Sequence, residues 1–212
     1  MVDRKARGAW ESLYSKHGIQ FGGAEDLAPL LKLLEPQTLV LDVGCGEGKS
    51  TEALMKTVEV VGCDFSREAL TRLRHRVDLH NGLNLVECDM VSLPFGDEKF
   101  DAISCVHALS HLVLGDRKAA AKEMSRVTRP GGLIFIEAFD REDLRYGQGE
   151  VVESSTFVRG NGIMTHYFRM GEIAGLFPLA KNSVETQLSR RVTFGAKAGK
   201  RSVVRVLVRK QD

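Results

Sequence analysis

The chain has 212 residues, of which 43% are hydrophobic and 27% charged, and its formal net charge is +2. This length predicts one domain with a sizeable core, because two domains would be cramped. The amino-terminal segment is charged and lacks an apolar signal region, and no apolar run approaches the roughly 20 residues of a membrane span, so we expect a soluble, cytoplasmic protein without a membrane partner.

Cysteine spacing bears on the redox state and on metal binding. The four cysteines are far apart in the sequence and form no C-x-x-C pair. This spacing indicates neither a zinc site nor a disulfide framework. We therefore expect buried free thiols and no metal site.

Apolar runs alternate with amphipathic segments along most of the chain. The runs at 38–43, 58–64, 84–90, 100–106 and 131–139 are rich in Val, Ile and Leu, as is typical of strands. Residues 49–57, 66–77 and 116–128 lie between them and predict helices, the last of which ends before Pro130. This alternation predicts an α/β fold with a mostly parallel sheet and helices on both faces. Two further runs, 181–188 and 201–210, predict an antiparallel hairpin added to the sheet.

The loop after the first predicted strand resembles two ligand-binding loops and matches neither. A phosphate-binding P-loop needs a glycine five residues before Gly48, where the chain has Val43. A dinucleotide turn needs its third glycine three residues after the second, but the glycines here are Gly44, Gly46 and Gly48. The loop can instead bring backbone close to a flat ligand without phosphate, because glycine has no Cβ.

Acidic residues lie at the ends of the first three predicted strands. Asp42 is an acceptor suited to a cationic ligand. Asp64 ends the second strand, at the position from which a carboxylate binds both ribose hydroxyls in this kind of fold. Phe65 could then pack on the base, while Asp89 and Met90 after the third strand could contact an adenine amino group and ring face. Together these residues predict a nucleoside-like ligand.

Four motifs carry a resemblance to a known family. "LDVGCGEG", "GCDFS", "CDMVSLPFGDEKFDAISC" and "RVTRPGGLIFIE" resemble the successive motifs of class I S-adenosylmethionine-dependent methyltransferases, specifically the group similar to the ubiquinone and menaquinone biosynthesis enzymes. The resemblance covers roughly Leu39 to Glu137. It implies a doubly wound, Rossmann-like sheet of seven strands with an antiparallel C-terminal strand, and S-adenosylmethionine as the cofactor. The implied cofactor-binding residues are Tyr14, Asp42, Gly44, Cys45, Gly46, Gly48, Asp64, Phe65, Asp89, Met90 and Cys105.

Histidines and tyrosines supply the candidates for a general base. A base is needed only if the acceptor atom carries a proton that must leave. The predicted catalytic residues are His107 after the fourth strand, Tyr146 and His166, whereas His111 is assigned to packing. The Asn/Asp-Pro-Pro-Tyr/Phe loop of enzymes that methylate exocyclic amines is absent at 104–106, which argues against adenine or glutamine methylation.

We expect a single methyltransferase domain over 1–212 with four parts. These are an N-terminal helical lid at 1–36, a cofactor-binding core at 37–138, a substrate-cover insertion at 139–170, and a C-terminal helix and hairpin at 171–212. Trp10 and Tyr14 lie four residues apart on the first predicted helix, either in the core or on a lid over the cofactor.

Substrate choice is left open between three hypotheses. The insertion contains basic and aromatic residues that could hold an anionic or aromatic small molecule, or simply form a solvated loop with one hairpin: Arg141, Arg145, Tyr146, Arg159, His166 and Tyr167. From Lys181 onward the chain has nine Lys or Arg and two acids, as in an RNA-facing surface. We expect a small-molecule substrate, with a tRNA methyltransferase of the wobble-uridine type or a regulatory cofactor-binding protein as alternatives, and a monomer or homodimer.

Overall fold

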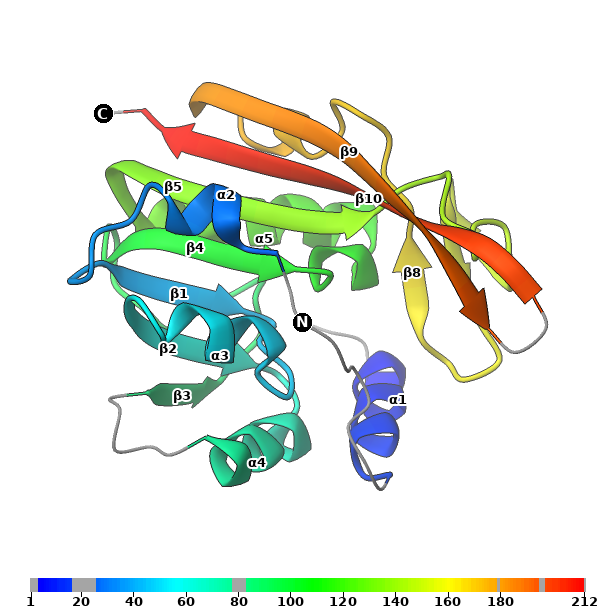
Figure 1. Cartoon of the computed structure of the whole chain (residues 1–212). Coiled ribbons are helices and arrows are strands. Elements are labelled where there is room, and N and C mark those ends of the chain that lie inside the picture. The colour runs from blue at the N-terminus through cyan, green and yellow to red at the C-terminus, as the bar shows by residue number, and fades with distance from the viewer. Residues whose placement is uncertain (1–3, 17–25, 78–82, 179, 195–196, 212) are drawn as a thin grey trace.

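The computed structural model describes residues 4–16, 26–77, 83–178, 180–194 and 197–211. Seven strands form one sheet in the order β3-β2-β1-β4-β5-β10-β9 (Figure 1). The parallel strands are β1 (Leu39–Val43), β2 (Glu59–Asp64), β3 (Asn84–Glu87), β4 (Phe100–Val106) and β5 (Thr128–Phe139). The hairpin consists of β9 (Ala180–Phe194) and β10 (Lys197–Lys210), and β10 runs antiparallel to β5. The predicted sheet, including its antiparallel C-terminal strand, is confirmed.

Helices cover both faces of this sheet because neighbouring residues of a buried strand point to opposite faces. Val40 packs in a cluster with residues of α2 (Ala28–Leu31), α3 (Lys49–Leu54) and α4 (Arg67–Arg76). Leu41 packs on the other face, with residues of α5 (Leu114–Val127). Ser66 caps α4 by accepting a hydrogen bond from the Ala69 amide at 3.2 Å. None of the helices that the structure describes is long and apolar enough to cross a membrane.

Two segments lie beyond the carboxyl ends of the parallel strands (Figure 1). One is α1 (Arg4–Tyr14). The other is the insertion after β5, which forms a separate sheet of β6 (Glu150–Glu153), β7 (Thr156–Val158) and β8 (Met164–His166). The insertion is therefore an ordered three-stranded unit at the ligand edge of the sheet, with more structure than one hairpin.

The helix expected at the start of 171–212 is wrong. The structure has one 3-10 turn there, η3 (Ala174–Leu176). Gly171 and Gly175 lower the stability of a helix at this place, and Pro178 cannot continue one.

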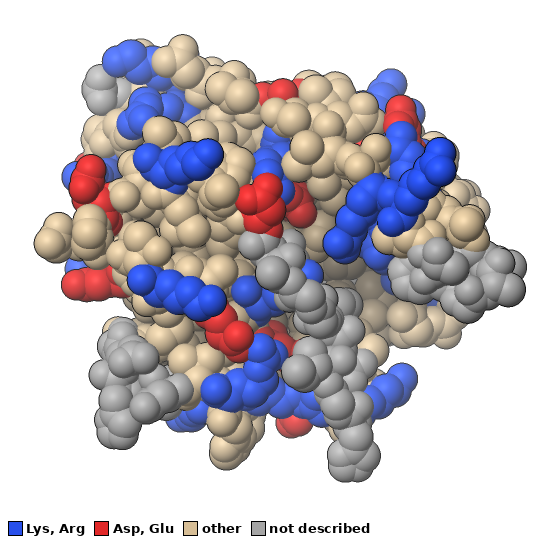
Figure 2. Space-filling model, viewed as in Figure 1, with Lys and Arg blue, Asp and Glu red and all other residues tan. Residues whose placement is uncertain are grey.

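The C-terminal hairpin is longer than the sheet edge to which it is attached. β10 pairs with β5 only over 203–209, so residues 197–202 extend past the end of β5. The extension is anchored to the insertion, because the Leu144 amide donates a hydrogen bond to the Lys200 carbonyl at 2.8 Å. Lys and Arg side chains gather over this hairpin, at the right of Figure 2. The basic C-terminal region thus reaches the edge of the sheet where α1 and the insertion lie.

Candidate functional site

The glycine loop connects β1 to α3 and is approached from two sides. Gly44, Gly46 and Gly48 have φ angles of 69°, 52° and 92°, which favour glycine. A Cβ on Gly44 would lie 2.3 Å from Cβ of Ala108, and one on Gly46 would lie 2.7 Å from the Tyr14 hydroxyl. The connection after β4 and the helix α1 therefore both meet the loop. Gly48 also has a packing role, because a Cβ there would lie 2.1 Å from Cδ1 of Leu73.

Asp64 closes the loop from the end of β2. Its carboxylate accepts hydrogen bonds from the Gly46 amide at 2.9 Å and the Ser66 amide at 2.8 Å. Each oxygen has a further lone pair that could accept from a ligand hydroxyl. Burial raises the pKa of Asp64 to about 6, although the two amide hydrogen bonds oppose this shift.

Asp42 lies behind the loop and is almost fully buried. Its carboxylate accepts a hydrogen bond from the Thr51 hydroxyl at 2.6 Å, which ties the end of β1 to α3. In this arrangement Asp42 helps to fix the loop conformation.

The remaining predicted cofactor residues surround the loop at different depths. Met90 is buried, and its Cε would lie 3.5 Å from a Cβ on Gly44. Asp89 accepts a hydrogen bond from the Val91 amide at 3.1 Å, and Phe65 is half-buried. Cys45 and Cys105 are buried, Cys105 in the core that packs against α5.

The helix α1 covers the loop. Tyr14 is buried over Gly46, and its ring centroid lies 5.8 Å from that of Trp10. Trp10 also contacts the His111 ring edge-on, at 4.7 Å between centroids. Glu11 accepts hydrogen bonds from the amides of Arg67 and Glu68 at the start of α4, at 3.1 and 3.4 Å. Residues 7–14 thus form a cover held at both the glycine loop and α4, and the contact with α4 is one that the sequence did not reveal.

His107 follows β4 in an unusual backbone conformation, with φ of 61°. Its ring stacks on Phe139 with centroids 4.2 Å apart and an interplanar angle of 7°. Burial, together with the nearby charge of Arg201, lowers the pKa of His107 to about 3. His107 therefore has a neutral ring at physiological pH, and its Nδ1 atom is buried without a hydrogen-bond partner in the described part of the chain. A strained backbone and an unpaired acceptor or donor are features of functional sites.

The other two predicted catalytic residues have different surroundings. His166 is buried, and its Nδ1 and Nε2 atoms lie 2.7 Å from the Thr156 hydroxyl and 2.8 Å from the Glu172 carboxylate. Both ring nitrogens are engaged, so this geometry favours a structural role that holds the insertion together. Tyr146 is partly exposed and packs edge-on against Phe157 and Tyr167.

A basic and aromatic cluster beside His107 includes residues that the sequence did not single out. Asp143 pairs with Arg145 at 2.9 Å and with Arg201 at 2.7 Å. Both guanidinium groups lie near the ring of Phe139, at 4.1 and 4.9 Å from its centroid. Phe139 could have been inferred from its place at the end of β5. Arg201 could not, because 58 residues separate it from Asp143.

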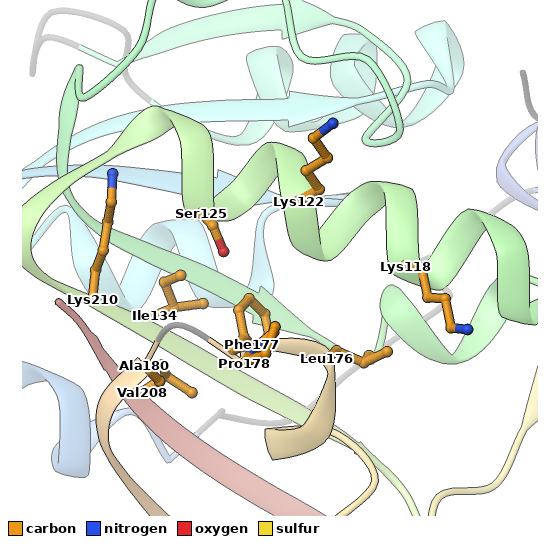
Figure 3. Close-up of a pocket in the computed structure, with 10 residues that line it drawn as sticks. All are labelled: Lys118, Lys122, Ser125, Ile134, Leu176, Phe177, Pro178, Ala180, Val208 and Lys210. Atoms are coloured by element: carbon orange, nitrogen blue, oxygen red, sulfur yellow. The ribbon is translucent and has the colours of Figure 1, made fainter.

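A cavity of about 250 Å³ lies elsewhere, between α5, η3 and β10 on the α5 face of the sheet (Figure 3). Its walls include Phe177, Ile134 and Val208, and lysines line its rim. None of the predicted site residues lines it, so it is separate from the edge described above.

Comparisons with known proteins address the identity of this site. Residues 41–136 match the model of a family described as "Methyltransferase domain". The tRNA N(3)-cytidine methyltransferase METTL2 of Gallus gallus is 26% identical over 171 residues, which cover 72% of this chain and 45% of that protein. The demethylmenaquinone methyltransferase of Corynebacterium urealyticum is 38% identical over 107 residues, or 50% of this chain and 44% of that one. The chain therefore spans less than half the length of either relative.

The fold has solved counterparts. A Methanosarcina mazei protein, described as one of the SAM-dependent methyltransferases, has a TM-score of 0.69 and 21% identity to this chain. The alignment covers 89% of this chain and all of that one.

Proposed function

Because residues 41–136 carry a methyltransferase domain and the sheet has the fold of S-adenosylmethionine-dependent methyltransferases, we propose that the chain methylates a small-molecule acceptor. S-adenosylmethionine is the cofactor of this class. The observation that carries the choice of acceptor is the wall beside His107, where Phe139, Tyr167 and the paired Arg145 lie at the carboxyl edge of the sheet.

The residues at the loop fit this cofactor. Gly44 and Gly46 carry no side chain that would stand between the loop backbone and a ligand, and a Cβ at either position would collide with Ala108 or Tyr14. Asp64 would accept hydrogen bonds from the ribose hydroxyls, with Met90 and Asp89 on the side of the adenine. When bound, S-adenosylmethionine supplies a methyl group already activated on a sulfonium.

The chain itself would contribute mainly by positioning the acceptor and the cofactor. Holding the acceptor atom in line with the methyl group supplies most of the rate. His107 is the best-situated residue to orient a polar acceptor, because its ring is fixed on Phe139 and its Nε2 atom lies 3.6 Å from Glu137. Its low pKa makes it a weak base and a neutral hydrogen-bonding group. Tyr14 and Trp10 would exclude water from above the loop.

A tRNA substrate is the second candidate function. Several relatives are named tRNA methyltransferases, among them METTL2 of Gallus gallus and the probable tRNA methyltransferase 9B of Mus musculus. The C-terminal hairpin also presents the exposed residues Arg190 and Arg191. Near His107, however, Arg145 and Arg201 are half-buried and paired with Asp143. Arginines held in this way suit a small ligand better than a nucleic acid backbone.

The proposal is tested by calorimetric titration with S-adenosylhomocysteine, followed by transfer of labelled methyl groups to metabolite pools and to bulk tRNA. We expect micromolar or tighter cofactor binding and label in a small molecule. Label in tRNA alone would favour the second candidate. Binding without transfer to any acceptor would favour a regulatory cofactor-binding protein.

A further inference from the structure

We infer that Arg145, Arg159 and Arg201 form a binding site for an anionic group of the acceptor, a carboxylate or a phosphate monoester. The inference rests on the proposed function and specifies its substrate class. Two of these arginines come from the insertion and one from the C-terminal hairpin.

The first observation is an excess of positive charge around one carboxylate. Asp143 is buried and accepts from Nε of Arg145 through one oxygen and from Nε of Arg201 through the other. One negative charge therefore orients two guanidinium groups. The neighbouring acids have other partners: Glu142 pairs with Lys200, and Glu137 pairs with Arg205.

The second observation is a set of buried guanidinium nitrogens without acceptors. Nη2 of Arg145 and Nε of Arg159 are buried and make no hydrogen bond to any described residue. A buried charged donor without a partner is costly, so such groups in native proteins usually have a role. The inferred anion would provide the missing acceptors, because guanidinium matches the geometry of carboxylate and phosphate.

The charges of Arg145 and Arg201 act on His107, whereas those of Arg145 and Arg159 act on His111. Burial and the charge of Arg145 lower the pKa of Arg201. The charges of Arg145 and Arg159 add to burial in lowering the pKa of His111 to about 4. An anion at this site would therefore lie close to the end of β4, where the acceptor atom must meet the methyl group.

The guanidinium groups are largely shielded from solvent, which favours a small ligand. The side chains of Arg145 and Arg201 are 19% and 20% exposed, and both pack on Phe139. The aromatic rings of Tyr146 and Tyr167 meet edge-on beside them. An aromatic or unsaturated acid fits this combination of flat apolar wall and paired guanidinium groups.

The experiment measures binding of three probes to the full chain saturated with S-adenosylhomocysteine. 4-Hydroxybenzoate and phenyl phosphate carry the two candidate anions, and 4-hydroxybenzamide is the neutral counterpart. We expect one or both anions to bind at least tenfold more tightly than the amide, and the tighter one identifies the anionic group. Arg145→Gln and Arg159→Gln should each weaken anion binding at least tenfold, while Arg145→Lys should lose less. Arg169→Gln is the matched control, because Arg169 is exposed at the end of the same insertion.

Equal binding of the amide would overturn the inference, as would anion binding that is unchanged in both Gln variants. Absence of anion binding up to about 10 mM would do the same. Titration with S-adenosylhomocysteine separates this result from failure of the proposed function. The variants should keep wild-type affinity for S-adenosylhomocysteine. A wild-type chain that binds anions but not S-adenosylhomocysteine would contradict only the methyltransferase proposal. If Arg145→Gln does not fold, Arg159→Gln, which leaves the Asp143 pairs intact, carries the test alone.

Discussion

Asp64 combines an observed structural role with the proposed ligand-binding role in one buried carboxylate. Its two hydrogen bonds from Gly46 and Ser66 fix the loop, and each carboxylate oxygen keeps a lone pair that could accept from the proposed ribose hydroxyls. A charged acceptor makes stronger hydrogen bonds than a neutral one. The protonation state of this single residue should therefore control cofactor affinity.

Cofactor binding should weaken in acid. With a pKa of about 6, Asp64 is ionised at pH 7.5 and only about one-tenth ionised at pH 5. We expect the dissociation constant for S-adenosylhomocysteine, measured by calorimetry, to rise about tenfold between these values. Asp64→Asn should weaken binding by roughly 2 kcal/mol at pH 7.5 and remove the pH dependence. Asp116→Asn, at a half-buried position in the first turn of α5, serves as the control, and a wild-type affinity that is flat from pH 5 to 8 would remove Asp64 from the site.

The contribution of Asp64 to folding stability should increase as the pH is lowered, in contrast to cofactor affinity. Because the folded pKa of Asp64 is raised above the unfolded value of about 4, the native state binds the proton more tightly. The contribution of Asp64 to the free energy of unfolding therefore falls as the pH rises from about 4 to about 6 and stays constant above that range. Urea unfolding at pH 4.5 and pH 7 measures this contribution as a difference in the free energy of unfolding. Asp64→Asn should lack the part of that difference that comes from Asp64. An identical pH dependence in both proteins would contradict the assigned shift.

Among the elements, α1 depends on contacts made with distant parts of the chain. The described contacts that hold it over the glycine loop include those of Glu11 with α4 and the pair of Arg7 with Glu87, beside the packing of Trp10 and Tyr14. A carboxylate at a helix N-terminus contributes roughly 0.5–1 kcal/mol. The position of this cover is therefore sensitive to single substitutions.

Removing the charge of Glu11 should loosen the cover. Trp10 is the only tryptophan in the chain, so its fluorescence reports α1 alone. In Glu11→Gln we expect the emission to shift to longer wavelength and amide hydrogen exchange over 8–16 to speed up about twofold to fivefold. Glu59→Gln, an exposed change at the start of β2, should alter neither measurement. Unchanged emission in Glu11→Gln would mean that Trp10 and Tyr14 hold α1 by packing alone.

At the scale of the whole molecule, the structure divides the basic C-terminal residues into two groups. Arg201 and Lys200 pair with Asp143 and Glu142 of the insertion. Arg190 and Arg191 are exposed on the edge strand β9. Net charge on an edge strand also discourages aggregation, so a basic hairpin does not by itself require RNA.

The exposed pair separates the two candidate substrates. In Arg190→Gln/Arg191→Gln we expect methyl transfer to the small acceptor and cofactor affinity to stay at wild-type values. If tRNA is the substrate, the double variant should bind bulk tRNA more weakly, with the slope of log affinity against log salt reduced by about 1.8. Filter binding between 50 and 200 mM salt measures this slope. A steep wild-type slope that is lost in the variant would overturn the choice of a small acceptor.

The sequence alone determined the sheet and the glycine loop at the carboxyl end of its first strand. Periodicity marked the strands and helices, and motif order identified the family resemblance, because both depend on residues near one another in the chain. Asp64, the glycines and the Ser66 cap follow directly from the strand–loop–helix order. The helix wrongly predicted at the start of 171–212 and the three-stranded insertion lie in segments without a clear hydrophobic period. In such segments the local conformational preference is weak, and tertiary contacts determine the secondary structure.

Only the tertiary structure decided which side chains meet at that edge. Tyr14 lies over Gly46, and Arg201 meets Arg145 at Asp143, although these residues are far apart in sequence. It also showed that His166 is held at both nitrogens, which no residue pattern signals. Such contacts depend on how far the hairpin extends past β5 and on how the insertion folds back. These are properties of packing between separate elements, whereas the sequence pattern reports the faces of each element one at a time.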